Sequence, residues 1–148
     1  MRLLFTLLFF VFSANFAFAG NLVQINVKEL QKILHDMQHD KLLFFFRSVC
    51  GCSKEATLSQ DLSKNKIIFI SLDDNQSDIE SFVKRMQYDV YYIQPTSDNI
   101  KALSDYLLID MNKNENGKVK LPRILLMNKE NKILSDHISK NSFREYLK

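Results

Sequence analysis

The chain of 148 residues contains no tryptophan, only three glycines, two prolines and two cysteines. Three isolated glycines cannot form a glycine-rich phosphate-binding loop, and there is no Gly-x-Ser-x-Gly elbow of the kind that carries a nucleophilic serine. A net charge of +3 is too small to indicate a nucleic-acid-binding surface. The chain is long enough to bury a hydrophobic core without a scaffold of disulfides. We therefore expect a globular domain with no nucleic-acid partner, whose two cysteines have another purpose.

The chain begins with a short apolar segment of the type that directs export. Residues 3–12 are nearly all apolar, and residues 17–19, Ala-Phe-Ala, have the small-x-small pattern of a cleavage site. We predict a signal peptide over residues 1–19, cut before Gly20, followed by a single domain over residues 20–148. The alternative is an uncut membrane anchor, although a membrane span takes about 20 apolar residues. Either way, the sequence predicts that the domain is exported to the periplasm.

The rest of the sequence alternates between helical and strand patterns. Apolar spacings of three and four residues predict helices around residues 30–37, 79–86 and 100–107, with weaker patterns after the cysteines and at residues 142–147. Short apolar runs predict strands over residues 41–46, 67–72 and 90–93, and two further strands joined as a hairpin around residues 129–131. Alternating strands and helices followed by a hairpin predict an α/β fold, with a central mixed sheet covered by helices on both faces.

Both cysteines, Cys50 and Cys52, follow the apolar strand predicted over residues 41–46. The carboxyl end of a central strand is where open α/β sheets place their functional sites. A helix start favours a nearby thiolate, and Arg47 and Lys54 flank the pair with positive charge. A disulfide that closes so short a loop removes little entropy from the unfolded chain, which disfavours a purely structural role. The spacing therefore predicts a redox-active pair that forms a reversible disulfide.

Three segments of the chain resemble the thioredoxin-like superfamily, and within it the exported TlpA-type thiol:disulfide oxidoreductases. They are LLFFFRSVCGCSKE, IIFISLDDNQSDIESFVKRMQYDV and LPRILLMNKENKIL. The resemblance implies a thioredoxin-like fold and disulfide exchange with cysteines of other exported proteins, without a metal or organic cofactor. It also implies a membrane or periplasmic electron-transfer partner. The chain departs from the family in its motif, because Cys50-Gly51-Cys52 has one residue fewer than Cys-x-x-Cys.

The resemblance also implies roles for individual residues. Cys50 would be the attacking thiol and Cys52 the resolving thiol, while Glu55 matches a glutamate that tunes proton transfer. Leu121 and Pro122 match the loop in which a cis-proline faces the dithiol and the preceding backbone binds the substrate. The residues alone leave other interpretations open: Glu55 could be an ordinary charge in a first helical turn, and Pro122 could simply start a strand.

Two positions differ from the family pattern in ways that bear on chemistry. Arg123 follows the proline where the family carries small hydroxylic residues, which predicts an altered substrate preference. Phe44 stands where thioredoxins carry a buried aspartate in the central strand. Proton handling would then be left to Glu55, to water or to nothing.

Two other functions fit the same cysteines. Thioredoxin-like copper carriers bind Cu(I) through two thiolates and a distant histidine, for which His137 is a candidate only by elimination. A binding module that kept the fold without turnover is the second alternative, because fold alone does not determine function.

Two weaker patterns resemble metal-binding motifs, but neither leads us to predict a metal site. His35 and His39 are four residues apart, but a histidine pair supplies only half of a usual zinc set, and a solvated helix face explains them better. Residues 73–78, DDNQSD, resemble a calcium loop, yet the loop lacks the glycine at its sixth position and the glutamate at its twelfth.

Overall fold

The structure is a computed structural model that describes residues 20–49, 67–86, 88–111 and 119–137. The helices and strands in these residues are β1 (Leu22–Gln24), α1 (Val27–Asp36), β2 (Lys41–Phe46), β3 (Ile67–Ser71), α3 (Gln76–Val83), β4 (Val90–Tyr92), α4 (Ser97–Leu107), β5 (Arg123–Met127) and β6 (Ile133–His137). The helices predicted after the cysteines and at the end of the chain lie outside the described residues.

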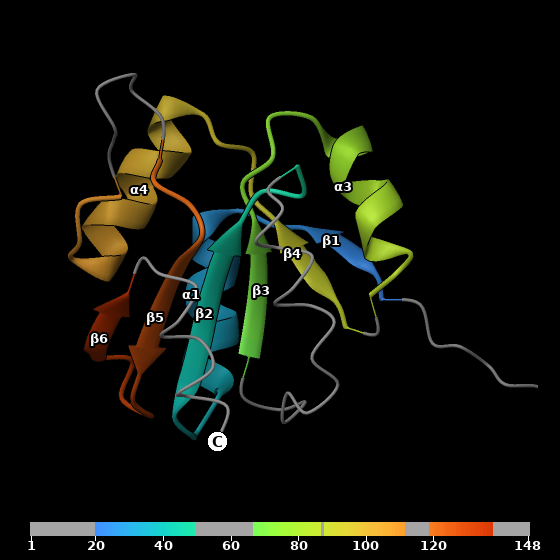
Figure 1. Cartoon of the computed structure of the whole chain (residues 1–148). Helices are drawn as coiled ribbons and strands as arrows, with labels where there is room; N and C mark the ends of the chain where they lie inside the picture. Colours follow the sequence, from blue (N-terminus) through green and yellow to red (C-terminus); the bar gives the residue numbers. More distant parts are fainter. Residues whose placement is uncertain (1–19, 50–66, 87, 112–118, 138–148) are drawn as a thin grey trace, which may run out of the picture.

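The described strands form one six-stranded sheet in the order β1-β4-β3-β2-β5-β6 (Figure 1). Neighbours among β1 to β4 run parallel, whereas β5 is antiparallel to both β2 and β6. This arrangement confirms the predicted mixed sheet, and the β5–β6 pair is the predicted hairpin. Strand β1 was not predicted, because only three residues pair with β4 and no residue of β1 is fully buried.

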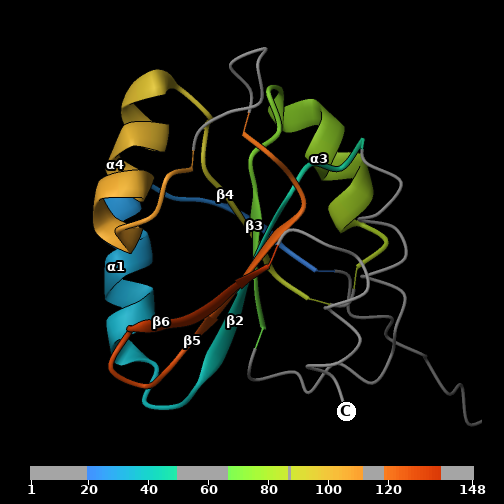
Figure 2. The same ribbon diagram turned by 60° about the vertical axis from the view of Figure 1, so that its left-hand side comes forward.

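Helices cover both faces of the sheet, as predicted. Helices α1 and α4 lie side by side on one face and α3 lies on the other (Figure 2). Side chains of β2 alternate between the two cores: Phe45 packs on the α1–α4 side, and Phe44 and Phe46 pack on the α3 side. All six residues of β2 are buried, as expected of a central strand with helices on both sides.

Side-chain hydrogen bonds cap the starts of helices α1 and α4. Asn26 Oδ1 accepts a hydrogen bond from the Glu29 N–H at 3.0 Å, and the Glu29 carboxylate accepts one from the Asn26 N–H at 2.7 Å, which together form a capping box. Thr96 caps α4 in a similar way through Asn99 N–H at 3.2 Å. Among the described residues, no helix is long and apolar enough to cross a membrane.

A buried lysine ties the start of β2 to the end of α1. Lys41 is only 1% exposed, and its Nζ donates to the carbonyl oxygens of Leu34 and Met37, both at 3.1 Å. These carbonyls belong to the last turn of the helix and its C-cap, where few backbone partners remain, and the Leu34 carbonyl also accepts from the Met37 N–H at 3.3 Å. Burial lowers the pKa of Lys41, while the charges of Asp40 and Glu130 oppose that shift. The apolar run of residues 41–46 thus begins with a charged side chain that has a structural role.

Candidate functional site

The strand that leads to the two cysteines ends at one edge of the central sheet. Strands β2 and β3 are parallel, so their carboxyl ends meet at the same edge, where both arrowheads point in Figure 1. Cys50, Cys52 and Glu55 themselves lie outside the described residues. Residues 47–49, here named the approach segment, lead from β2 toward Cys50 and are described in full. The geometry of the site is therefore read from this segment and from the residues that hold it.

A buried carboxylate holds the middle of the approach segment. Asp73, two residues after β3, is 2% exposed. Its two oxygens accept from the Ser48 N–H, each at 3.0 Å, and Oδ1 also accepts from the Ser48 hydroxyl at 2.8 Å. The Ser71 hydroxyl donates to Oδ2 at 2.6 Å and accepts from the Asp73 N–H at 3.2 Å. Ser48 and Ser71 are buried as well, so the network is shielded from solvent.

The first residue of the approach segment is also attached to the chain that follows β3. The Arg47 Nε donates to the Leu72 carbonyl at 3.1 Å, and its guanidinium lies 3.5 Å from the Asp74 carboxylate. The Leu72 N–H donates to the Phe46 carbonyl at 2.9 Å. Two strand ends therefore continue as a hydrogen-bonded pair beyond the sheet. Val49, the last described residue before Cys50, is by contrast 76% exposed.

This network contains a buried carboxylate that the sequence did not predict. The sequence leaves proton handling to Glu55, to water or to nothing, because Phe44 occupies the usual place of a buried aspartate, and this stays a prediction. Phe44 is indeed core, 1% exposed and 5.7 Å from the Phe69 ring between centroids. The structure supplies a buried carboxylate from another place, since Asp73 comes from the end of β3. The one signal in the sequence was Ser71, a polar residue inside an otherwise apolar strand.

The calcium-loop pattern of residues 73–78 has a different explanation in the structure. The oxygens of Asp73 are occupied by the two serines, and residues 76–78 already belong to helix α3. Within the part of the chain that the structure describes, no three His, Cys, Asp or Glu side chains are grouped so that they could hold a metal ion.

The proline loop lies at the same edge of the sheet as the approach segment. The Leu121–Pro122 peptide bond is cis, as the resemblance led us to expect. Pro122 directly precedes β5, whose first residue, Arg123, pairs with Phe45 near the carboxyl end of β2. Leu121 and Pro122 are both half-buried. The antiparallel register therefore brings the proline loop beside the strand that leads to the cysteines.

Arg123 does not extend from this loop toward solvent, and the altered substrate preference stays a prediction. It is 7% exposed, and its guanidinium forms an ion pair with Asp136 of β6, with Nε to Oδ1 at 2.9 Å. It also donates to the Asp110 carbonyl beyond the end of α4. Arg123 thus connects β5, β6 and the chain after α4, which is a structural role.

Tyr92, the last residue of β4, allows a test of the charges around this network. Burial raises the pKa of Tyr92, and the charges of Asp73 and Asp74 raise it further. A raised pKa favours the neutral phenol in the folded state, so this stabilisation is complete below the ordinary value of 10.0 and is lost as the pH rises through the folded-state pKa. We expect urea unfolding to show a smaller loss of stability between about pH 8 and about pH 11 in Tyr92→Phe than in the wild type. Equal losses in the two proteins would contradict this account.

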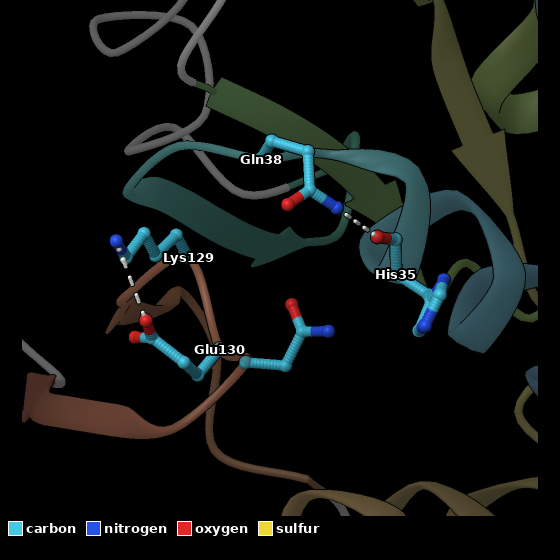
Figure 3. A pocket seen from close by; sticks show the side chains of 5 residues that line it. His35, Gln38, Lys129 and Glu130 are labelled. Carbon is cyan, nitrogen blue, oxygen red and sulfur yellow. Dashed lines mark hydrogen bonds and ion pairs between the residues drawn. The ribbon is translucent and has the colours of Figure 1, made fainter.

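A polar surface depression lies apart from this network. It is lined by His35, Gln38, Lys129, Glu130 and Asn131, between the end of α1 and the β5–β6 turn (Figure 3). Gln38 Nε2 donates to the His35 carbonyl at 3.1 Å, and Lys129 lies 3.7 Å from Glu130. The His35 side chain is 83% exposed, as the prediction of a solvated face requires.

The other two histidines, His39 and His137, lie outside helix α1. Helix α1 ends at Asp36, so His39 lies beyond the helix, and the two histidines do not share one helical face as the spacing suggested. His137 is the last residue of β6. The copper hypothesis also requires Cys50 and Cys52, which lie outside the described residues, so it stays a hypothesis.

Comparison with known proteins places the fold. No family model and no curated protein matches the sequence. Among solved structures, the chain resembles a thiol:disulfide interchange protein of the thioredoxin family from Chlorobium tepidum, with a TM-score of 0.54, 13% identity, and coverage of 79% of this chain and 81% of that chain. It also resembles StoA from Bacillus subtilis, with a TM-score of 0.48, 17% identity, and coverage of 76% and 85%. The protein has a thioredoxin-like fold, which confirms the predicted fold class.

Proposed function

We propose that the protein is an exported thiol:disulfide oxidoreductase that acts on cysteines of other exported proteins through Cys50 and Cys52. The observation that carries this proposal is the thioredoxin-like fold, in which the segment that precedes the cysteines leaves the carboxyl end of a central strand. Cys50 is two residues beyond Ser48, which is held at the carboxyl end of β2. The cis-proline loop lies at the same edge of the sheet. Open α/β folds place their sites at this edge.

The proposed reaction is a pair of thiol–disulfide exchanges. The Cys50 thiolate attacks one sulfur of a substrate disulfide, forms a mixed disulfide and releases the other substrate sulfur as a thiolate. The Cys52 thiolate then attacks the Cys50 sulfur, which closes the Cys50–Cys52 disulfide and releases the second substrate thiolate. Two electrons pass to the substrate, and the reverse sequence oxidises it. No metal or organic cofactor takes part.

Other residues have supporting roles in this proposal. Leu121 and Pro122 present their backbone to the substrate chain beside the dithiol, and Glu55 assists proton transfer. A membrane or periplasmic electron-transfer partner returns the dithiol to its starting state. Residues 1–19 act as the signal peptide, and the domain over residues 20–148 works in the periplasm.

Reduction of insulin disulfides by the purified protein, with dithiothreitol as the source of electrons, tests this function. We expect the wild type to accelerate the reaction and the double variant Cys50→Ser/Cys52→Ser to match the rate without protein, because a hydroxyl cannot form a disulfide. Wild-type protein that is no faster than the double variant would refute the proposal. In that case, tight one-to-one Cu(I) binding that is lost in His137→Ala would favour a copper carrier.

A further inference from the structure

Asp73 has no part in the reaction proposed above. Among the buried charged residues that the structure describes, it is the one hydrogen-bonded to the approach segment. Three groups donate to its oxygens: the Ser48 N–H, the Ser48 hydroxyl and the Ser71 hydroxyl. An ionised carboxylate only accepts, so this set of donors suits the charged form. A carboxylate that is 2% exposed also acts over a longer range than one in water, because solvent screens it less.

Covalent geometry limits how far this charge can be from the first cysteine. Each residue of an extended chain spans at most about 3.6 Å, so the Cα of Cys50 is within about 7 Å of the Cα of Ser48 in any conformation. Ser48 itself contacts the Asp73 carboxylate, because its hydroxyl donates a hydrogen bond to Oδ1 at 2.8 Å. A like charge at roughly 10 Å, in surroundings of effective dielectric near 20, changes an ionisation equilibrium about tenfold.

We propose that Asp73 is a positioning residue for the dithiol. Asp73 holds the approach segment through Ser48, and its negative charge disfavours the Cys50 thiolate. The inference rests on the proposed function in that it assigns Asp73 a role at that site. Three other charged or titratable groups face the network: Arg47 and Asp74, which pair with each other, and Tyr92 at the end of β4. Arg47 favours the thiolate and Asp73 opposes it, so the balance of the two sets the reactivity of Cys50. By destabilising the thiolate, which contributes to the stability of the reduced pair, Asp73 also makes the dithiol more reducing.

The test uses the full chain with the substitution Cys52→Ser, so that Cys50 is the single thiol. Alkylation by iodoacetamide is followed as a function of pH, with and without Asp73→Asn, which removes the charge and nearly keeps the shape. We expect Asp73→Asn to lower the midpoint of the alkylation profile by about one pH unit and to speed alkylation at pH 7 by up to about tenfold. An unchanged midpoint in a variant that circular dichroism shows to be folded would overturn the proposal.

Three control variants separate charge from structure. Ser71→Ala removes one hydrogen bond and Asp73→Glu keeps the charge, so both are expected to leave the midpoint near that of the parent. Asp74→Asn removes a neighbouring charge whose side chain is 64% exposed, and we expect a clearly smaller shift than with Asp73→Asn. If the alkylation midpoint fell as far in Asp73→Glu or Asp74→Asn as in Asp73→Asn, the assignment would be overturned. If Asp73→Asn does not fold, Asp73→Ser takes its place, with the same fall expected.

Alkylation needs no disulfide exchange, so this inference and the proposed function can fail separately. If the insulin assay fails while Asp73→Asn shifts the midpoint, the proposed reaction is wrong but Asp73 still controls the Cys50 thiol. If insulin is reduced and the midpoint does not move, the assignment of Asp73 alone is wrong.

Discussion

Replacing Cys50 by serine is expected to lower the rate of disulfide exchange by roughly a thousandfold or more, because only a thiolate attacks a disulfide at a useful rate. Replacing Cys52 is expected to have a different result. The Cys52→Ser variant keeps the attacking thiol but cannot resolve the first intermediate, so it should accumulate mixed disulfides with exported proteins. Non-reducing gels of periplasmic extracts would show these as bands of higher mass that disappear on reduction.

The two single variants are each other's controls in this experiment. They differ from the wild type by one sulfur atom each, and their positions are separated only by Gly51. If Cys50→Ser alone trapped mixed disulfides, the roles of attacking and resolving thiol would be reversed. If neither variant trapped a partner and both kept full exchange activity, the cysteines would not carry the reaction.

Phe46→Ala is expected to cost about 3 to 5 kcal/mol of unfolding free energy, the range found when a large buried aromatic side chain is truncated. Phe46 is fully buried, and its ring centroid lies 5.6 Å from that of Phe44, 6.4 Å from Phe69 and 5.5 Å from Phe82. Truncation removes apolar contact with β2, β3 and α3 at once and leaves a cavity. Urea unfolding, followed by far-ultraviolet circular dichroism, measures the loss.

Two substitutions serve as controls for this prediction. Phe46→Leu keeps most of the apolar volume and should cost clearly less than Phe46→Ala. Val49→Ala lies three residues further along, where the side chain is 76% exposed, and should change stability by no more than about 0.5 kcal/mol. A loss in Phe46→Ala as small as that in Val49→Ala would show that the aromatic cluster on the α3 side does not stabilise the fold as described.

The sequence by itself was sufficient to predict the strands and helices whose apolar residues follow a regular spacing. The continuous apolar run of residues 41–46 predicted a strand buried on both faces, and β2 has those bounds. Spacings of three and four residues located the helices, although α3 ends at Val83 and leaves Met86 beyond it. Such patterns can be recognised because buried positions recur along the sequence with the period of the helix or strand. The mixed sheet with helices on both faces followed from the order of these elements, and the thioredoxin-like fold and the cis-proline followed from the resemblance.

Only the tertiary structure decided which polar groups meet. Asp73 contacts Ser48 across 25 residues of sequence, and Arg123 forms an ion pair with Asp136 in the next strand. Neither partnership leaves a periodic trace, because a hydrogen bond depends on where two strand ends come to lie and not on the spacing within either segment. Apolar side chains are interchangeable contributors to a core, so their pattern predicts burial. A buried carboxylate needs particular donors at about 3 Å, and these are brought together only when β2 and β3 pair in parallel.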